Sequence, residues 1–350
     1  MNIVYGVSGE GYGHSSHASA ISSYLKKNNH NILIIAYGKS YDILAIKFKT
    51  LKVNGLQIIC EDGAINHLKT IIFNLKNFKK NTQIIRKLIK EINHFKPDLF
   101  ISDMEPISAY LSYYCRIPLL TISNQNRFIN YKLKIPAQYK KDFFIAKLII
   151  KLITPKADYK ATLSFEKLKS KNRNSFCSNP IIREEVLNLK PNYNGKLLVY
   201  LSKKNKKIIN VLKKSNREFI IYGYDINKKV KNLEYNNKKF FLKDLEECKA
   251  IISTSGFTSI GEAIYLKKPY LAIPLKGQFE QLFNAIYVKQ KKIGLYTESL
   301  TLDELNEFIS NLEIYKENLN KIKINHEEIY NLIDKILSLV EKQKANNNLI

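Results

Sequence analysis

Two apolar runs near the amino terminus, Asn2–Val7 and Asn31–Ala36, restrict the fold more than any other feature of the chain. Between them lie a glycine-rich turn at residues 8–14 and a helix-forming segment from about Ser15 to Lys27. A strand, a turn, a helix and a second strand in this order form a right-handed parallel crossover. The chain is therefore predicted to begin as a doubly wound α/β domain, with the glycine-rich turn at the carboxyl end of the first strand.

The alternation of strand and helix begins again in the second half of the chain, where the apolar runs are Lys196–Leu201, Phe219–Tyr222 and Ala250–Ser253. A chain of 350 residues exceeds the size, roughly 250 to 300 residues, at which single hydrophobic cores stop growing, so two domains are expected. The Pro-containing stretch Cys177–Arg183 is the natural boundary. We expect domains at 1–178 and 179–350, with an amphipathic helical tail from Leu302.

The run Ala250–Ser253 leads into a Ser/Thr/Gly turn, and a helix-forming segment begins near Ser259. The first N–H groups of a helix have no partner within the helix, and the positive end of its dipole lies behind them, so such a helix start binds phosphate. Gly256 lets a ligand approach the backbone, while Ser255 and Thr258 offer hydroxyl donors. The turn is therefore predicted to bind a diphosphate.

Polar residues beyond this turn suit the rest of a nucleotide sugar. Glu262 lies within the first turns of the same helix, where its carboxylate is expected to accept two hydrogen bonds from a ribose diol. A second strand follows between Pro269 and Pro274. The helix after it opens with polar groups that suit sugar hydroxyls, namely Glu280, Gln281 and Asn284.

Residues 256–263, the strand at 268–274 and residues 280–285, in this order and spacing, resemble the donor-site signature of GT-B glycosyltransferases. The likeness is greatest to the group of the lipid II N-acetylglucosaminyltransferase and the galactolipid synthases (glycosyltransferase family 28-like). It implies an α/β chain of two Rossmann-like doubly wound domains that face each other across a cleft, with a carboxyl-terminal helix that crosses back to the first domain. It also implies a nucleotide-sugar donor, expected to be a UDP-sugar, with the Phe257 N–H on the diphosphate. Phe241 matches an aromatic that stacks on uracil, and the alternative for it is a core phenylalanine. The alternative is an ordinary αβ segment whose Ser, Thr and Gly residues only cap a helix.

The glycine-rich turn, taken alone, would suit a dinucleotide. Two features oppose that interpretation: His14 stands where a dinucleotide fingerprint needs a small residue, and no acidic residue follows the second strand at 36–39. The turn resembles the GT-B loop that presents a base to the acceptor. The resemblance implies His14 as the general base, Gly11 and Gly13 as loop residues, and His17 as an accessory acceptor contact.

Asp103 and Glu105 follow a predicted buried strand at Leu99–Ser102, so they emerge at the edge where open parallel sheets bind ligands. Relatives show a similar Asp-x-Glu-Pro, and either carboxylate is a candidate to orient His14 or to bind an acceptor hydroxyl. The alternative is that Asp103 caps the following helix, predicted at Pro106–Cys115.

The resulting hypothesis is transfer of a hexose-type sugar from the nucleotide sugar to a hydroxyl of a lipid-linked or polysaccharide acceptor, with inversion. No Asp-x-Asp pattern of the metal-dependent transferases occurs in the chain, so neither a metal nor a cofactor is expected. The alternatives are a nucleotide-sugar epimerase or hydrolase of the same architecture, and a noncatalytic nucleotide-sugar binding protein.

The net charge of +26 comes mostly from Lys, which supplies 51 of the 57 basic residues. Nucleic-acid readers depend on Arg for bidentate contacts and show recognisable motifs, so no nucleic-acid partner is expected. The basicity suits phosphorylated substrates or an anionic membrane surface. At Ala137–Lys156, Lys147 and Lys151 share one helical face, which is typical of an interfacial helix and also of a core helix with one exposed stripe.

Four cysteines stand far apart, at positions 60, 115, 177 and 248, which predicts free thiols that pack as small core residues and no metal cluster. Neither a signal peptide nor a membrane-spanning run of 18 apolar residues is visible. We therefore expect a cytoplasmic protein, with peripheral contact to the inner face of the cell membrane if the segment at 143–153 meets lipid.

Overall fold

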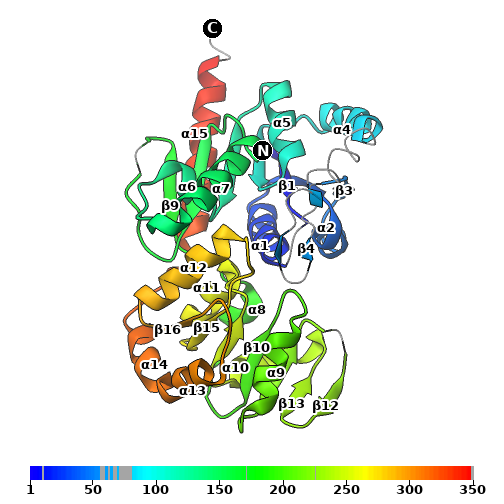
Figure 1. The fold of residues 1–350 in the computed structure, drawn as a ribbon. Helices are drawn as coiled ribbons and strands as arrows, with labels where there is room; N and C mark the ends of the chain where they lie inside the picture. The colour runs from blue at the N-terminus through cyan, green and yellow to red at the C-terminus, as the bar shows by residue number, and fades with distance from the viewer. Residues whose placement is uncertain are drawn as a thin grey trace. The chain divides into compact units, whose positions relative to one another are not determined.

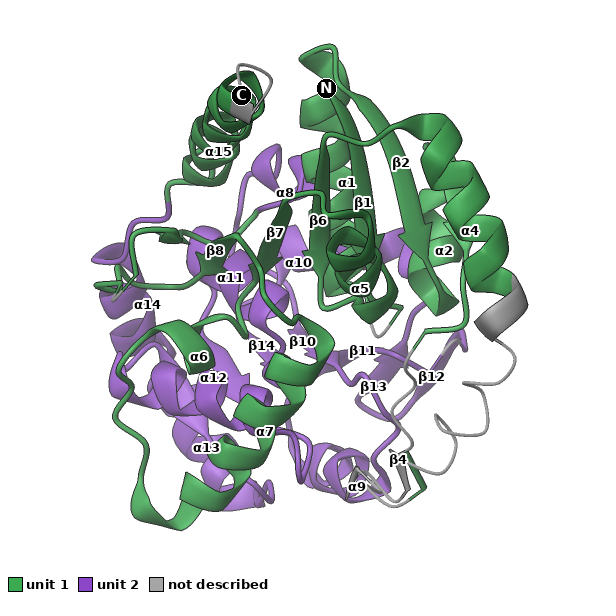
Figure 2. Ribbon diagram, turned by 90° about the horizontal axis from the view of Figure 1, so that it is seen from above, with its two compact units in different colours: residues 1–59, 66–181, 325–350 green, residues 60–65, 182–324 purple. Residues whose placement is uncertain are grey.

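A computed structural model describes residues 1–9, 12–55, 60–61, 64–65, 69–70, 81–170, 172–224 and 226–347. The chain divides into two compact units, coloured separately in Figure 2. Unit 1 comprises residues 1–59, 66–181 and 325–350, and unit 2 comprises residues 60–65 and 182–324.

Unit 1 contains a parallel seven-stranded sheet in the order β3-β2-β1-β6-β7-β8-β9 (Figure 1). Its strands are β1 (Asn2–Val7), β2 (Asn31–Ala36), β3 (Thr50–Lys52), β6 (Leu99–Asp103), β7 (Leu119–Ser123), β8 (Tyr159–Leu163) and β9 (Ser175–Ser178). Its helices are α1 (Gly13–Lys27), α2 (Gly38–Leu44), α4 (Asn81–Phe95), α5 (Pro106–Cys115), α6 (Arg127–Asn130), η1 (Ala137–Tyr139), α7 (Lys140–Ile153) and α15 (Glu328–Asn347). The strand order reverses between β1 and β6, which makes their carboxyl ends the topological switch point where such sheets bind ligands.

Unit 2 repeats this plan with the order β12-β13-β11-β10-β14-β15-β16, in which only β12 is antiparallel to its neighbour. Its sheet is built from β10 (Leu197–Tyr200), β11 (Phe219–Tyr222), β12 (Lys228–Val230), β13 (Leu233–Tyr235), β14 (Ile251–Ser253), β15 (Tyr270–Ala272) and β16 (Gly294–Tyr296). Its helices are α8 (Glu184–Leu187), α9 (Lys206–Lys214), η2 (Lys238–Phe240), α10 (Phe241–Glu247), α11 (Phe257–Tyr265), α12 (Phe279–Gln290), α13 (Leu302–Ser310) and α14 (Leu312–Asn320). The short pair β4 (Cys60–Glu61) and β5 (Ala64–Ile65) is antiparallel. The switch point of unit 2 lies between β10 and β14.

The strands are continuous apolar runs because helices cover both faces of a parallel sheet, so that every side chain of a central strand is buried. In β1 all residues after Asn2 are buried, and all of β6 and β7 are buried. The predicted bounds of β1, β2, β11 and α5 are confirmed residue for residue. The expected two doubly wound α/β sheets are both present.

The carboxyl-terminal helix α15 packs within unit 1, against α1 and the sheet. Tyr24 of α1 stacks on Tyr330 with ring centroids 4.5 Å apart, and its hydroxyl donates to Asp334 Oδ2 at 2.6 Å. Tyr24 is half-buried, and these contacts lie beside the buried apolar side chains of α15. These buried side chains include Ile333, Ile336 and Val340.

The helix α7 differs from one of the two predictions made for it. Of its residues only Ile150 is buried, whereas Phe144 is 68% exposed and Leu152 is 60% exposed. The interpretation of this segment as a core helix is therefore wrong, because its apolar side faces outward. No helix within the described residues is long and apolar enough to cross a membrane.

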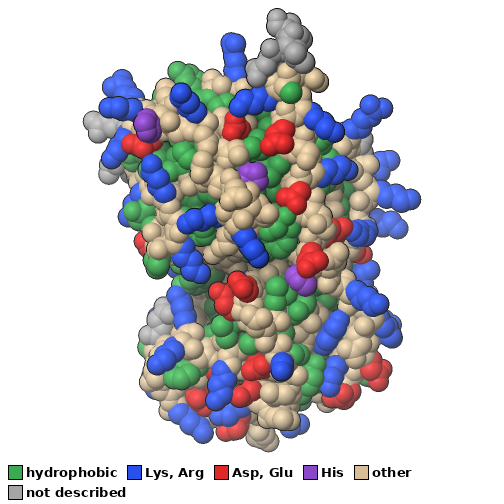
Figure 3. All heavy atoms as spheres, turned by 180° about the vertical axis from the view of Figure 1, so that it is seen from behind, with side chains coloured by type: hydrophobic (Ala, Val, Ile, Leu, Met, Phe, Trp, Pro, Cys, Tyr) green, Lys and Arg blue, Asp and Glu red, His purple; other side chains and the backbone are tan. Residues whose placement is uncertain are grey.

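Lys and Arg side chains are scattered over the face drawn in Figure 3 and do not gather in one patch. Among the described cysteines, Cys248 is buried and Cys115 and Cys177 are half-buried, all as free thiols. Of these three cysteines, only Cys248 has the predicted core position. The prediction for Cys60 concerns a side chain that the structure does not describe.

Candidate active site

The switch point of unit 1 brings a histidine and an aspartate together. Val7 and Asp103 are paired at the ends of β1 and β6, and the Ser8 N–H donates to the Asp103 carbonyl at 3.1 Å. The helix α1 begins at Gly13, which places His14 in its first turn. His14 Nδ1 lies 2.8 Å from Asp103 Oδ1. With Nδ1 bound to a carboxylate, Nε2 is the nitrogen that can take a proton.

Burial differs between the two partners of this hydrogen bond. The Asp103 side chain is 1% exposed, whereas the His14 side chain is 19% exposed. A buried carboxylate that holds a partly exposed imidazole fixes the ring and stabilises its protonated form once a proton has been accepted. Chemically, such an arrangement can serve as a general base with an orienting acid, the role that the sequence predicted for His14.

His17 lies one turn further along α1 and is almost fully buried. Its Nδ1 is 3.9 Å from Asp103 Oδ2, which is too long for a hydrogen bond. Burial lowers the pKa of His17 to about 4, against the attraction of Asp103 and together with the repulsion of His14. The ring is therefore neutral near pH 7, and an acceptor contact by His17 stays a prediction.

Glu105, and not Asp103, caps α5. Its Oε1 accepts from the Ile107 N–H at 2.9 Å and its Oε2 from the Ser108 N–H at 2.6 Å. The interpretation of Asp103 as the cap is wrong, because Asp103 ends β6 and Met104 turns the chain with a left-handed φ of 54° before the helix. Burial raises the pKa of Glu105 to about 7, although the two N–H groups act in the opposite direction. This carboxyl group is committed to the helix start.

Part of the glycine-rich loop lies outside the described residues, and Gly11 is among them. Gly13 is the first residue of α1. Gly9 has no room for a side chain, since a Cβ there would lie 2.4 Å from both the ring and the carbonyl of Tyr37. The loop therefore passes closely over the residue that follows β2.

At the switch point of unit 2 the chain turns from β14 into α11. Ser255 has a left-handed φ of 60°, and the Asn284 amide donates to its carbonyl at 3.0 Å. Gly256 occupies the N-cap position of α11, which therefore has no side-chain cap. Among the described residues, a Cβ on Gly256 would meet only Ser259 Oγ, at 3.5 Å, an ordinary van der Waals contact, so this position has room for a Cβ.

The Ser255 hydroxyl is the second unusual feature of this turn. Ser255 is fully buried, and its Oγ has no hydrogen-bond partner among the described residues. A buried hydroxyl without a partner costs about 1–3 kcal/mol of stability, which a ligand atom would recover. Phe257 and Thr258 begin the helix, so their backbone N–H groups belong to its first turn. These groups lie at one helix start, as the sequence predicted, and their binding of a diphosphate stays a prediction.

The three polar residues of α12 lie in different environments. Asn284 is fully buried behind the Ser255 turn, so the predicted contact with sugar hydroxyls is corrected to support of the turn. Gln281 Oε1 accepts from the Leu275 N–H at 2.9 Å and holds the segment that follows β15. Glu280 is half-buried in the first turn of α12.

Glu262 is bound by a residue that the sequence analysis did not select. Arg183 Nε donates to Glu262 Oε1 at 2.6 Å and its Nη2 to Oε2 at 3.1 Å. Burial would lower the pKa of Arg183, but the charge and hydrogen bonds of Glu262 outweigh burial, so the pKa is raised. The Arg183 guanidinium also lies 5.8 Å from the ring centroid of Phe241. The sequence feature that could have indicated Arg183 is its residue type, because the chain has 51 lysines and only six arginines.

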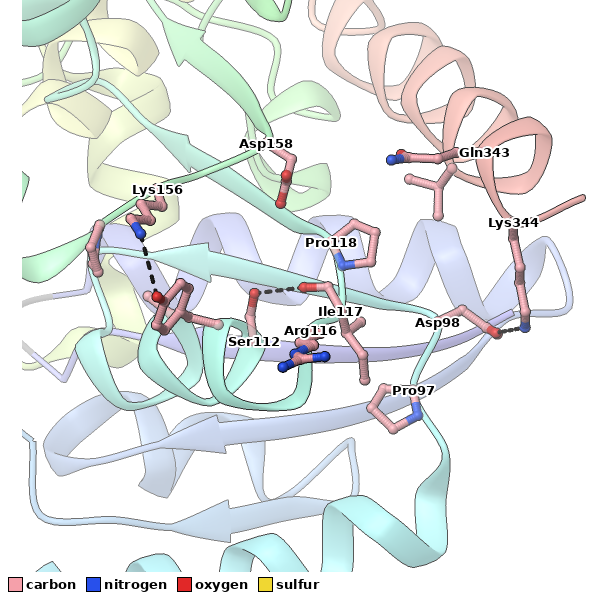
Figure 4. A pocket seen from close by; sticks show the side chains of 14 residues that line it. Pro97, Asp98, Ser112, Arg116, Ile117, Pro118, Lys156, Asp158, Gln343 and Lys344 are labelled. Atoms are coloured by element: carbon pink, nitrogen blue, oxygen red, sulfur yellow. Dashed lines mark hydrogen bonds and ion pairs between the residues drawn. The ribbon is translucent and has the colours of Figure 1, made fainter. Parts of the chain in front are cut away.

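A cavity of about 510 Å³ in unit 1 lies elsewhere (Figure 4). Its lining includes Asp98, Pro118 and Asp158, which precede β6, β7 and β8, so it lies at the amino edge of the sheet, opposite His14. Both aspartates are engaged, since Asp98 accepts from the Asn2 N–H and Asp158 from the Leu119 N–H, each at 2.8 Å. The described residues contain no cluster of three His, Cys, Asp or Glu able to hold a metal.

The protein is similar to several known proteins. An uncharacterized glycosyltransferase of Methanosarcina acetivorans is 24% identical over 84% of this chain and 85% of the relative. A UDP-N-acetylglucosamine–N-acetylmuramyl-(pentapeptide) pyrophosphoryl-undecaprenol N-acetylglucosamine transferase of Clostridium novyi is 30% identical over 39% of this chain and 40% of the relative. Among solved structures, the glycotransferase of kitacinnamycin has a TM-score of 0.66 at 12% identity, covering 98% of each chain.

A further solved structure, the glycosyltransferase VinC in complex with dTDP, has a TM-score of 0.62 at 14% identity and covers 98% of this chain and 100% of its own. At such identities these structures support the fold, which is GT-B. The model of glycosyl transferase family 1 matches residues 1–313. Since that match spans most of the chain and includes both switch points, the chain belongs to glycosyl transferase family 1 and is a glycosyltransferase.

Proposed function

We propose that this glycosyltransferase moves a hexose-type sugar from a UDP-sugar to a hydroxyl of a lipid-linked or polysaccharide acceptor, with inversion and without a metal ion. The hydrogen bond between His14 and Asp103 carries the proposal, because it supplies an oriented base at a ligand-binding edge. The uncapped start of α11, with the Ser255 hydroxyl, supports a diphosphate donor. The Clostridium relative, whose name includes a UDP-sugar, favours uracil as the base.

In the proposed reaction His14 Nε2 takes the proton of the acceptor hydroxyl, and Asp103 stabilises the imidazolium that results. The acceptor oxygen bonds to the anomeric carbon from the face opposite the leaving group. The bond between that carbon and the phosphate oxygen breaks, and UDP leaves with the electron pair. In this proposal the N–H groups at the start of α11 and the Ser255 hydroxyl hold the charge that develops on UDP.

Replacement of His14 tests this mechanism. His14→Ala is expected to lower turnover by roughly 10² to 10⁴, the usual contribution of a positioned base, with unchanged UDP affinity. His30→Ala, at a half-buried histidine of the same unit, is the matched control. Near wild-type turnover in His14→Ala would refute the assignment of the base.

Assays with UDP-sugar alone distinguish the alternative activities. Steady release of free sugar or of an epimer without any acceptor would replace transfer by hydrolysis or epimerisation. UDP binding without turnover under all acceptor conditions would leave a noncatalytic nucleotide-sugar binding protein.

We also propose that the protein acts at a membrane surface. The exposed apolar side chains of unit 1 support this part of the proposal. Of the twelve large hydrophobic side chains that are exposed among the described residues, eight lie on α5 and α7. This apolar platform consists of Tyr110, Tyr113, Tyr114, Phe144, Ile145, Leu148, Ile149 and Leu152. The Tyr110 hydroxyl donates to the Leu152 carbonyl at 2.9 Å, which joins the two helices. A contiguous apolar surface of this kind marks an interaction site.

The chemistry around the platform favours an anionic bilayer as its partner. At about 100° per residue, Lys140, Lys147 and Lys151 share one flank of α7, beside the exposed apolar stripe. Lys156 lies 4.6 Å from the Tyr113 ring centroid. Lysines beside an apolar stripe attract anionic lipid while tyrosines suit the headgroup level, so we propose that α7 lies in the plane of the interface.

Sedimentation with vesicles of phosphatidylglycerol and phosphatidylcholine tests this part of the proposal. At low salt, Lys147→Glu with Lys151→Glu is expected to reduce binding by about 1 kcal/mol per removed lysine or more. Phe144→Ser with Leu148→Ser should reduce binding at any salt. Ile46→Ser, at a residue 82% exposed in the same unit, is the control that should bind as wild type. Wild-type protein that stays in the supernatant ends the membrane proposal.

A further inference from the structure

We infer that Arg183 is the positioning residue of the donor site: it sets the Glu262 carboxylate for the ribose and orients the Phe241 ring for the base. This inference rests on the proposed nucleotide-sugar function. Its basis is the contact of one guanidinium with both groups, which lie 21 residues apart on α10 and α11.

The first step concerns the capacity of Glu262 to accept hydrogen bonds. An ionised carboxylate has about four lone-pair positions, and Arg183 uses one on each oxygen. One position on each oxygen remains for the two hydroxyls of a ribose. The planar fork of Arg183 fixes the plane of the carboxylate, so the remaining lone pairs have a defined direction.

The second step concerns the charge of Glu262. The side chain of Glu262 is only 6% exposed, so without Arg183 a buried carboxylate would lack its counter-charge. Removing one partner of a buried ion pair is strongly unfavourable, because it leaves the other charge uncompensated. Arg183 therefore supplies the counter-charge with which the Glu262 side chain is buried at this position.

The third step concerns Phe241. Its ring meets Tyr222 edge to face, with centroids 5.0 Å apart and an interplanar angle of 85°, and meets Tyr200 at 6.1 Å and 67°. The Arg183 guanidinium lies within cation–π range of the same ring, at 5.8 Å. Three neighbours thus fix the ring that is expected to stack on the base, and one of them is tied to the ribose carboxylate.

The identity of the residue fits this role. A lysine is a compact point charge that cannot engage both carboxylate oxygens in parallel and does not stack on a ring. This chain uses Lys at 51 of 57 basic positions, yet Arg stands at 183. Arg183→Lys is therefore expected to keep the positive charge beside Glu262 but to lose the paired hydrogen bonds to its two oxygens.

Calorimetry with UDP and 2′-deoxy-UDP tests the inference, because only UDP offers both ribose hydroxyls. Wild type should prefer UDP. Arg183→Met, which keeps the apolar stem, should weaken UDP roughly tenfold to a hundredfold and reduce the UDP preference to the value of Glu262→Gln. The double variant should lose less affinity than the two single losses combined, since both changes remove the Arg183–Glu262 interaction, and its loss beyond that of Glu262→Gln measures the contact with Phe241.

Two further variants complete the experiment. Arg183→Lys should regain part of the affinity but little of the preference, and it replaces Arg183→Met if that variant does not fold. Arg217→Met, at an exposed arginine of unit 2, should leave both affinities unchanged.

The outcomes separate this inference from the proposed function. An Arg183→Met protein that loses UDP affinity but keeps the full preference over 2′-deoxy-UDP overturns the inference, because Arg183 would then contact the phosphates directly. Full affinity in Arg183→Met overturns it as well. A wild-type protein that binds neither nucleotide overturns the proposed function and the inference with it.

Discussion

The turn from β6 into α5 in unit 1 and the turn from β14 into α11 in unit 2 have nearly the same backbone. The first turn follows β6, which pairs with β1, and the second follows β14, which pairs with β10. Each of these strand pairs forms the switch point of its sheet. Each turn has a left-handed residue other than glycine directly before the N-cap, Met104 with φ 54° and Ser255 with φ 60°. They differ at the N-cap itself, which is Glu105 in one unit and Gly256 in the other.

This single difference decides what each helix start can bind. The Glu105 carboxylate accepts from two N–H groups of α5, so that helix start is closed by its own side chain. Gly256 contributes no side chain, so the start of α11 has no side-chain cap. In unit 1 the polar groups that remain as candidates for ligand binding are therefore the side chains of His14 and Asp103, and not the N–H groups at the start of α5. One turn can thus stabilise the protein or hold a ligand, depending on its N-cap residue.

Closing the second helix start should produce the largest effect. Gly256→Glu gives α11 the type of cap that α5 has, and the backbone φ of −64° with open space at Cβ allows it. UDP affinity should fall roughly 10²- to 10³-fold, because a fixed carboxylate competes for charge-assisted hydrogen bonds. The melting temperature should stay the same or rise. Calorimetry with Gly256→Ala as the control checks this, and retained UDP affinity in Gly256→Glu would refute an open anion site.

The closed helix start should show itself in the pH dependence of stability. Burial raises the pKa of Glu105 in the folded protein from the usual 4.5 to about 7, so between these pH values the folded protein binds more protons than the unfolded chain. The contribution of Glu105 to the free energy of unfolding is therefore fully present below pH 4.5 and is lost as the pH rises through about 7. The loss amounts to at most about 3 kcal/mol. Urea unfolding of wild type and Glu105→Gln at pH 5 and pH 8 measures the loss, which should be absent in the variant.

His17 contributes to the pH dependence of stability in the opposite direction, and its contribution cancels when wild type and Glu105→Gln are compared. Its pKa is depressed from 6.5 to about 4, so its contribution to stability is lost as the pH falls below 6.5. The contribution is the same in wild type and in Glu105→Gln. Identical pH slopes for the two proteins would therefore contradict a protonated Glu105.

The smallest expected effect concerns the Ser255 hydroxyl. Ser255→Ala removes a buried group that lacks a hydrogen-bond partner among the described residues, so the free energy of unfolding should rise by about 1 kcal/mol, the lower end of the cost of such a group. The same change should weaken UDP about tenfold, since it removes one hydrogen-bond donor. Thermal unfolding with and without UDP measures both effects. A variant that is less stable without UDP would mean that the hydroxyl already has a partner in the folded protein.

Much of the architecture was predictable from local sequence. Continuous apolar runs such as Asn31–Ala36 specify buried parallel strands, and Pro106 with Cys115 bounds a helix that the structure reproduces. The order of strands and helices requires right-handed crossovers, and these place residues after β1, β6 and β14 at the ligand-binding edges. The positions of His14, Asp103 and Ser255 at these edges follow from this rule.

The tertiary structure decided the partner of each side chain. The choice of Glu105 over Asp103 as the cap depends on the left-handed turn at Met104, which no periodicity reveals. Arg183 and Glu262 are 79 residues apart, and Asn284 and Ser255 are 29 apart, so these contacts exist only after the sheet of unit 2 has formed. The outward face of α7 is undetermined locally, because an apolar stripe has the same pattern whether protein or solvent covers it. Hydrophobic periodicity specifies elements and their order, whereas side-chain pairing depends on which elements packing brings together.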